Sequence, residues 1–190
     1  DNGSTDESLS VLKQEFPDVL TLCFDKNYGY AEGYNRAIRE LGYRYSVLLN
    51  SDVAATPEWI RPLYEYMEAH PEVAACQPKI LSDADHTKFE YAGASGGFID
   101  KHGYPFCRGR IFDTVETDNG QYNDITDIFW ATGAALTVRT EEYLAAGGLD
   151  KDFFAHMEEI DLCWRLHQRG LAIRVIPQSV VFHLGGGSLP

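Results

Sequence analysis

The hydrophobic and polar positions of the chain form two kinds of segment. Short apolar runs indicate buried strands, and stretches with an apolar residue every three or four positions indicate amphipathic helices. Strands are expected at residues 19–25, 45–50, 73–81 and 134–139, with one or two more in 171–183. Helices are expected at residues 8–16 and 33–41, from 56–57 onward, at 141–148 and within 153–170. This alternation predicts an α/β fold with a mostly parallel sheet and flanking helices.

One long segment departs from this alternation. Residues 82–127 are rich in Gly, Tyr and Asp, as in "YAGASGGFIDKHGYPF". This composition favours hairpins and long loops, and loops of that length tend to be functional. No internal repeat or linker divides the chain, so residues 1–190 are expected to form a single domain.

Composition and charge narrow the function. A hydrophobic content of 44% indicates a globular protein, and no apolar run reaches the ~18 residues of a membrane span. The net charge is −13 without a Lys/Arg cluster, which argues against a nucleic-acid partner. The four cysteines form no C-x-x-C pair, so we expect reduced thiols, no structural zinc and a cytoplasmic, reducing compartment.

Ligands of open α/β sheets bind beyond the carboxyl ends of the strands, so polar residues there are candidates for function. The first cluster is "NYGYAEGYN", residues 27–35. Its glycines, Gly29 and Gly33, would let the backbone approach a phosphate or ribose. The spacing matches neither a dinucleotide fingerprint nor a P-loop, and taken alone an ordinary turn explains it better.

The second cluster is "LLNSDV", which places Asp52 after a buried strand. Mg²⁺ and Mn²⁺ prefer carboxylate oxygen, and Mg²⁺ often takes only one or two protein carboxylates together with phosphates. Taken alone, Asp52 is better explained as a turn or cap before Thr56.

The third cluster contains Glu158, Glu159 and Asp161, with His183 downstream. On a helical wheel Glu159 lies near the middle of the apolar arc, Glu158 at its edge and Asp161 on the polar side. The helix dipole explains Glu158, but burying an unpaired Glu159 would cost several kcal/mol. Asp161 is expected to pair with Arg165. His183 taken alone is more simply a core histidine.

Together these clusters resemble the family-2 glycosyltransferases, in particular the rhamnosyltransferase-like members that build bacterial surface polysaccharides. The matching segments are, in order, "DNGSTD", "NYGYAEGYNRAI", "LLNSDV", "GAALTVR", "FFAHMEEIDLCWR" and "VFHLGGGS". They extend from Asp1 to about Ser188. The resemblance implies the GT-A fold, a nucleotide-binding α/β sheet with a metal ion at the strand ends.

The resemblance also implies where a nucleoside-diphosphate sugar would bind. Asp1 would contact the nucleobase, and the loop around Asn27, Gly29 and Asn35 would face ribose and phosphate. Asn50 occupies the first position of the family's D-x-D motif, in the nucleotide site.

The same resemblance implies the catalytic residues. Asp52 is the remaining aspartate of the D-x-D motif, and with His183 it would hold Mg²⁺ or Mn²⁺. Glu159 matches the catalytic base in the family's E-D pair, with Glu where Asp is usual and Glu158 as the alternate. An inverting transfer needs such a carboxylate to take the proton of the acceptor hydroxyl.

The acceptor and the cellular setting are implied more broadly. Gly133 and Ala134 would line the acceptor side, and the acceptor would be a saccharide or a lipid-linked saccharide. The expected setting is cell-surface polysaccharide biosynthesis in the cytoplasm or at the inner face of the membrane.

Relatives carry a strand before the position of Asp1, so the domain is expected to be N-terminally truncated, with that strand missing. Residues 19–25 would then pair with residues 45–50, or exposed strand edges would join two chains as a homodimer. With that strand missing the nucleobase pocket would be incomplete, so the 190 residues are expected to transfer sugar poorly or not at all. The alternative function is a noncatalytic or truncated nucleotide-sugar-binding domain. A sugar nucleotidyltransferase, the third candidate, would need a basic Gly-rich loop at its start.

Overall fold

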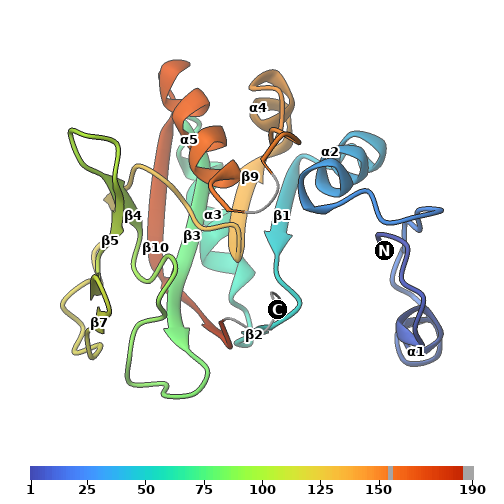
Figure 1. The fold of residues 1–190 in the computed structure, drawn as a ribbon, viewed down its shortest axis with the longest axis horizontal. Helices are drawn as coiled ribbons and strands as arrows, with labels where there is room; N and C mark the ends of the chain where they lie inside the picture. Colours follow the sequence, from blue (N-terminus) through green and yellow to red (C-terminus); the bar gives the residue numbers. More distant parts are fainter. Residues whose placement is uncertain (154–155, 186–190) are drawn as a thin grey trace.

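A six-stranded sheet forms the centre of the molecule (Figure 1). The computed structural model describes residues 1–153 and 156–185, so residues 186–188 of the last motif lie outside it. The strand order is β1-β9-β3-β10-β2, with β8 also paired to β10. The strands are Tyr45–Leu49 (β1), Val53–Ala55 (β2), Val73–Ser82 (β3), Thr126–Asp127 (β8), Ala135–Arg139 (β9) and Ala172–His183 (β10).

The sheet is mixed, which corrects the expectation of a mostly parallel sheet. β3 and β10 are parallel, but β9 is antiparallel to β1 and β3, and β2 is antiparallel to β10. A parallel strand requires a crossover that returns the chain to the starting edge. The long segment between β3 and β9 makes no such return, so β9 begins beside the carboxyl end of β3 and is antiparallel to it.

Helices cover both faces of the sheet. Leu63 and Met67 of α3 pack with Val73 and Ile176 in one buried cluster. The helices α2, α4 and α5 contribute to a separate and larger cluster that also contains residues of β3, β9 and β10. The helices are Ser8–Glu15 (α1), Tyr30–Leu41 (α2), Ile60–Ala69 (α3), Thr140–Ala145 (α4) and Glu158–Gln168 (α5).

Residues 19–25 do not form a strand, contrary to the sequence prediction. Val19 and Leu20 are 55% and 72% exposed. At the outer edge of β1 the hydroxyl of Tyr34 instead bonds both the N–H and the C=O of Leu49. An extended segment needs a partner for its backbone groups, and this one has no pairing with β1. The segment lies with α1, which buries no residue, away from the sheet (Figure 1).

The long segment after β3 forms hairpins, as predicted. It builds a four-stranded antiparallel sheet from Gly97–Ile99 (β4), Pro105–Cys107 (β5), Arg110–Ile111 (β6) and Thr114–Val115 (β7). Lys79 on β3 anchors this segment, because its buried ammonium pairs with Asp118 at 2.6 Å and also bonds Asn123. A buried ammonium without such partners would be costly, so the pairing fixes the segment on the main sheet.

No helix within residues 1–153 and 156–185 has the length and apolar character needed to cross a membrane.

All four cysteines are unpaired, three of them buried (Cys76, Cys107 and Cys163) and Cys23 exposed. The prediction of reduced thiols is consistent with this arrangement.

Candidate active site

Asp52 and His183 meet at the carboxyl end of β10. The short strand β2 pairs with β10 so that Val53 lies opposite His183. The N–H of Leu184 donates to the C=O of Asp52 at 3.1 Å, and His183 Nε2 lies 3.1 Å from Asp52 Oδ1. The sequence placed both residues in one site, and the structure brings them into contact.

Glu90 approaches the other nitrogen of the same ring. Its Oε1 lies 3.4 Å from His183 Nδ1, so each imidazole nitrogen faces a carboxylate. The pKa of His183 is raised from its ordinary value, chiefly by the Glu90 carboxylate and then by Asp52, while burial opposes the rise. Glu90 lies in the segment without recognisable motifs, and nothing in its sequence neighbourhood indicated this position.

Asp52 has an oxygen to spare for a cation. Its Oδ2 is buried and has no hydrogen-bond partner within the described chain, which is unfavourable for a carboxylate oxygen. No group of three or more His, Cys, Asp and Glu side chains in residues 1–153 and 156–185 is arranged to hold a metal ion. A carboxylate and an imidazole still suit Mn²⁺ or Mg²⁺ when phosphate oxygens complete the coordination. The residues therefore fit a cation that arrives with a diphosphate.

The candidate base lies at the start of α5. His156 and Met157, just before the helix, both have positive φ, at 70° and 75°. Such backbone is strained for residues other than glycine, and strain of this kind clusters at functional sites. The turn delivers Glu158 and Glu159 into the first turn of the helix, facing the segment before β9.

Burial differs from the helical-wheel prediction. Glu158 is only 8% exposed and Glu159 is partly exposed, whereas Trp164, assigned to the apolar arc, is 48% exposed. The buried face is narrower than predicted and centres on Leu162 and Leu166. Glu158 Oε2 is buried without a hydrogen-bond partner among the described residues. Glu158 therefore lies on the buried side of the helix and Glu159 at the edge of that side.

The surroundings of Glu159 shift its pKa. Burial, with a smaller contribution from the charge of Glu158, raises its pKa to about 7, although backbone N–H groups at the helix start act in the opposite direction. A base whose pKa lies near the working pH combines a useful ionised fraction with good proton affinity. Asp161 is not part of this pair, because it binds Arg165 at 2.6 Å, as predicted.

Gly133 and Ala134 connect the two halves of the site. The C=O of Ala134 accepts the N–H of Asn50, at the end of β1. The C=O of Gly133 accepts the hydroxyl of Tyr30 at 3.0 Å, and a Cβ added to Gly133 would lie 3.9 Å from the Cβ of Glu159. The turn before β9 thus places the "NSD" segment and the start of α5 around one region.

The predicted nucleobase and ribose residues lie on the loops near α2. Asp1 accepts the N–H groups of Gly3 and Ser4 through Oδ2, in a turn of its own. Asn27 Oδ1 accepts the N–H of Gly29 at 2.7 Å and the side-chain amide of Asn2 at 3.0 Å. Asn2, which the sequence patterns did not single out, thus holds the Gly29 loop in place.

Asn35 has a different position from the one expected. It is 6% exposed, and its Oδ1 accepts the hydroxyl of Tyr143 at 2.7 Å and the N–H of Leu149 at 3.0 Å. Its amide donates to the C=O of Leu149 at 2.8 Å. The side chain therefore ties α2 to the chain after α4, and a contact with ribose would require it to give up these bonds.

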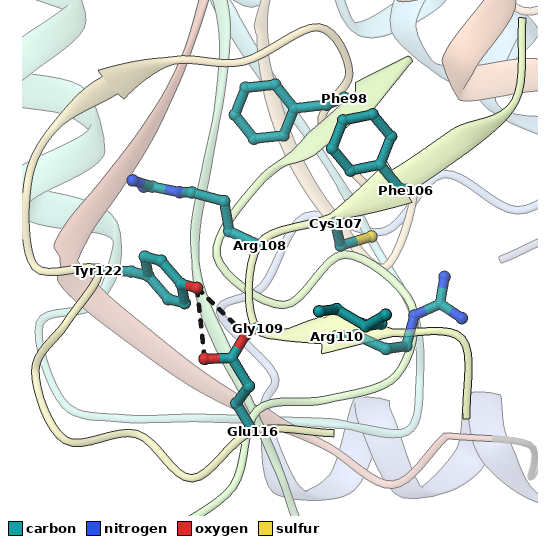
Figure 2. A pocket seen from close by; sticks show the side chains of 9 residues that line it. Phe98, Phe106, Cys107, Arg108, Gly109, Arg110, Glu116 and Tyr122 are labelled. Atoms are coloured by element: carbon teal, nitrogen blue, oxygen red, sulfur yellow. Dashed lines mark hydrogen bonds between the residues drawn. The ribbon is translucent and has the colours of Figure 1, made fainter. Parts of the chain in front are cut away.

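A pocket of about 450 Å³ lies at the small hairpin sheet (Figure 2). Figure 2 shows Phe98 next to Phe106, Arg108 directed towards Tyr122, and the Tyr122 hydroxyl bonded to Glu116. None of the residues that the sequence assigned to the site lines this pocket. The candidate active site is instead the region where β1, β2, β10 and α5 converge.

The site and the fold together agree with a known family. Residues 1–129 match the family model described as "Glycosyl transferase family 2". Because the match covers more than half of the 190 residues, the chain belongs to glycosyl transferase family 2.

Two similar proteins are rhamnosyltransferases by name. The N-acetylglucosaminyl-diphospho-decaprenol L-rhamnosyltransferase of Mycobacterium tuberculosis is 27% identical over 198 residues, covering 96% of this chain and 64% of that protein. The rhamnosyltransferase WbbL of Escherichia coli K12 is 32% identical over 163 residues, covering 82% of this chain and 61% of that protein. The chain thus spans less than two thirds of the length of either relative.

A solved structure shows the same fold. The crystal structure of GalNAc-T7 with UDP, GalNAc and Mn²⁺ superimposes with a TM-score of 0.71 at 13% identity, over 96% of this chain and 36% of that chain. At this identity the likeness concerns the fold, which is GT-A, as the sequence motifs implied.

Proposed function

We propose that this chain transfers a sugar, with inversion, from a nucleoside-diphosphate sugar to a hydroxyl of a saccharide or lipid-linked saccharide. The observation that carries the proposal is the turn at Gly133 and Ala134. On one side it lies beside Glu159, whose pKa of about 7 suits a base, and on the other it binds Asn50, two residues before Asp52. Segments far apart in sequence supply these groups, and the turn at Gly133 and Ala134 links them.

Each group has a role that follows from its chemistry. Glu159 takes the proton of the acceptor hydroxyl as that oxygen attacks the anomeric carbon on the face opposite the leaving diphosphate. Asp52 and His183 would hold Mn²⁺ or Mg²⁺, which when bound neutralises the charge of the leaving diphosphate. The Gly29 loop, held by Asn2, would face the ribose and phosphates, and Asn50 borders the same region.

The names of the relatives suggest the substrates. Two are named rhamnosyltransferases and a third, from Shigella flexneri, a dTDP-rhamnosyl transferase. We extend this to a deoxyhexosyl donor and an acceptor built on N-acetylglucosaminyl-diphospho-lipid, in the synthesis of a cell-surface polysaccharide. A lipid-linked acceptor would bring the reaction to a membrane surface.

Transfer is tested with radiolabelled dTDP-rhamnose, a polyprenyl diphosphate carrying N-acetylglucosamine, and Mn²⁺. We expect labelled lipid-linked disaccharide from the unaltered chain at a low rate, and a strong further loss in Glu159→Gln. A nucleotide panel in calorimetry runs in parallel. Mn²⁺-dependent binding of nucleoside diphosphates without transfer to any acceptor would leave a noncatalytic binding domain and contradict the proposal.

A further inference from the structure

Glu90 is buried without any role in the proposed chemistry. Its side chain is 6% exposed and that of His183 is 8% exposed. An ionised carboxylate at such depth is costly unless charged or hydrogen-bonded groups compensate it. The groups that meet the two oxygens of Glu90 therefore indicate why a carboxylate stands there.

The two oxygens have different partners. Oε2 accepts the N–H of Ala92 at 2.5 Å, which fixes the carboxylate relative to its own backbone. Oε1 lies 3.4 Å from Nδ1 of His183. The backbone is fixed as well, because the N–H of Glu90 donates to the C=O of Ile80 on β3. The carboxylate is thus held by the main sheet, and its free oxygen faces the imidazole.

This contact determines which way the ring faces. A neutral imidazole carries a proton on one nitrogen and a lone pair on the other. A cation bound by Nε2 therefore requires the proton on Nδ1. In the structure Nδ1 has no formed hydrogen bond within the described residues, and the acceptor that it faces is Glu90 Oε1, 3.4 Å away. Rotating the ring by half a turn would replace Nδ1 by a carbon and lose the contact with Glu90. Histidines that bind metals generally donate their second N–H to such a carboxylate or carbonyl.

Gly185 leaves the space that Glu90 needs. A Cβ added at this position would lie 3.1 Å from Glu90 Oε1, and the residue has a φ of +66°. Glycine accepts this backbone conformation without strain and keeps the carboxylate uncrowded. The segment after β10 is therefore shaped around the Glu90 carboxylate as well as around the ring.

We propose that Glu90 is a positioning residue for His183, one that holds the imidazole with Nε2 towards the cation side of Asp52. The proposal rests on the metal-assisted transfer proposed above. A purely structural Glu90 would instead stabilise the fold without affecting metal affinity, and the two roles can be separated by measurement.

The test measures the affinity of the chain for Mn²⁺ in the presence of dTDP, by calorimetry corrected for the binding of Mn²⁺ to free dTDP, because the cation is proposed to arrive with a diphosphate. In Glu90→Gln the single amide oxygen can serve Ala92 or His183 but not both. We expect Mn²⁺ affinity to fall about 10- to 100-fold, the usual cost of losing such an outer carboxylate. The matched control is Glu116→Gln, the same change in the same inserted segment, which should leave the affinity unchanged.

Thermal midpoints of the metal-free variants show whether the fold is retained. If Glu90→Gln lowers the midpoint, Glu90→Asp is measured as well. It keeps the charge but withdraws the carboxylate from Nδ1 of His183 by one methylene, so Mn²⁺ affinity should fall in this variant too. Unchanged Mn²⁺ affinity in Glu90→Gln, or an equal loss in Glu116→Gln, would overturn the proposal. An unaltered chain that binds no Mn²⁺ would overturn it together with the metal role in the proposed function. A fall in Mn²⁺ affinity in Glu90→Gln, combined with no sugar transfer by the unaltered chain, would support the role of Glu90. It would reject only the proposed transferase function.

Discussion

Nε2 of His183 lies 3.1 Å from Oδ1 of Asp52, although 131 positions separate the two residues. The short antiparallel strand β2 accounts for this contact, because its first residue, Val53, lies opposite His183 on β10. The residue before that strand must then lie beside the end of β10. A three-residue strand therefore creates the proposed cation site.

Asp52→Asn should abolish the Mn²⁺-dependent part of nucleoside-diphosphate binding and leave the fold intact. Asp52 Oδ2 is free to bind a cation, and Asn50 supplies no second carboxylate. Calorimetry with and without Mn²⁺ measures the effect, with Asp113→Asn on the exposed surface as the matched control. Unchanged Mn²⁺-dependent affinity in Asp52→Asn would remove this residue from the site.

The family resemblance implied this contact, but it did not imply the neighbour Glu90. Asp52 and His183 each follow a recognisable strand, where ligands of such sheets bind, but only the order of the family motifs assigned both to one cation. Glu90 lies in the inserted segment, whose path depends on the buried Lys79–Asp118 pair and on hairpins without helical or strand periodicity. Long-range pairing of this kind leaves no local pattern.

The errors in the fold have the same origin. The direction of β9 depends on the route of the preceding insertion, and composition does not encode that route. The run 19–25 has the apolar character of a strand, but a strand also needs an edge to pair with. Tyr34 occupies the Leu49 backbone groups at the edge of β1.

Glu159→Gln should lower turnover about 10²- to 10⁴-fold, the usual contribution of a general base. Because the ionised carboxylate is the active form, the turnover of the unaltered chain should rise with pH and level off above about 7, the pKa of Glu159. The variant should lack this rise. Glu158→Gln is the control and should cost far less. If Glu158→Gln instead caused the larger loss, the base would be Glu158.

The same carboxyl should make stability depend on pH. Its pKa is about 7 in the folded chain and 4.5 without the environment of the fold, so the folded state holds the proton more tightly. This stabilisation is complete below about pH 4.5 and is lost as the pH rises through about 7. Glu159→Gln should therefore stabilise the chain at pH 8, by up to a few kcal/mol.

Urea unfolding at pH 4 and pH 8 measures this difference, with Glu141→Gln on the exposed side of α4 as the control. The gain in the free energy of unfolding should be present at pH 8 and absent at pH 4. An equal gain at both values would mean that the titration of Glu159 does not cause it.

Asn35→Ala should destabilise the fold, because it strips partners from the buried hydroxyl of Tyr143 and from the backbone of Leu149. Leaving such groups unpaired costs roughly 1–3 kcal/mol each. Tyr143→Phe removes only one member of the cluster and should cost less. Loss of nucleotide affinity with undiminished stability in Asn35→Ala would instead support the ribose contact that the motif suggested.

The last prediction concerns the space between Gly133 and the start of α5. A Cβ at Gly133 would lie 2.8 Å from the hydroxyl oxygen of Tyr30 but 3.7 Å from Cζ of that ring. Gly133→Ala should therefore displace Tyr30, break its bond to the Gly133 C=O and disturb the wall beside Glu159. Because a displacement of about 1 Å near reacting groups can cost 10²-fold, turnover should fall strongly.

Tyr30→Phe removes the oxygen that the new Cβ would meet, so the double variant provides the control. We expect Gly133→Ala to be much more harmful in the unaltered chain than in a chain that already carries Tyr30→Phe, a coupling that a double-mutant cycle on turnover measures directly. Additive effects would mean that the Cβ acts elsewhere, and the contact between Tyr30 and the Gly133 turn would then have no part in shaping the acceptor side.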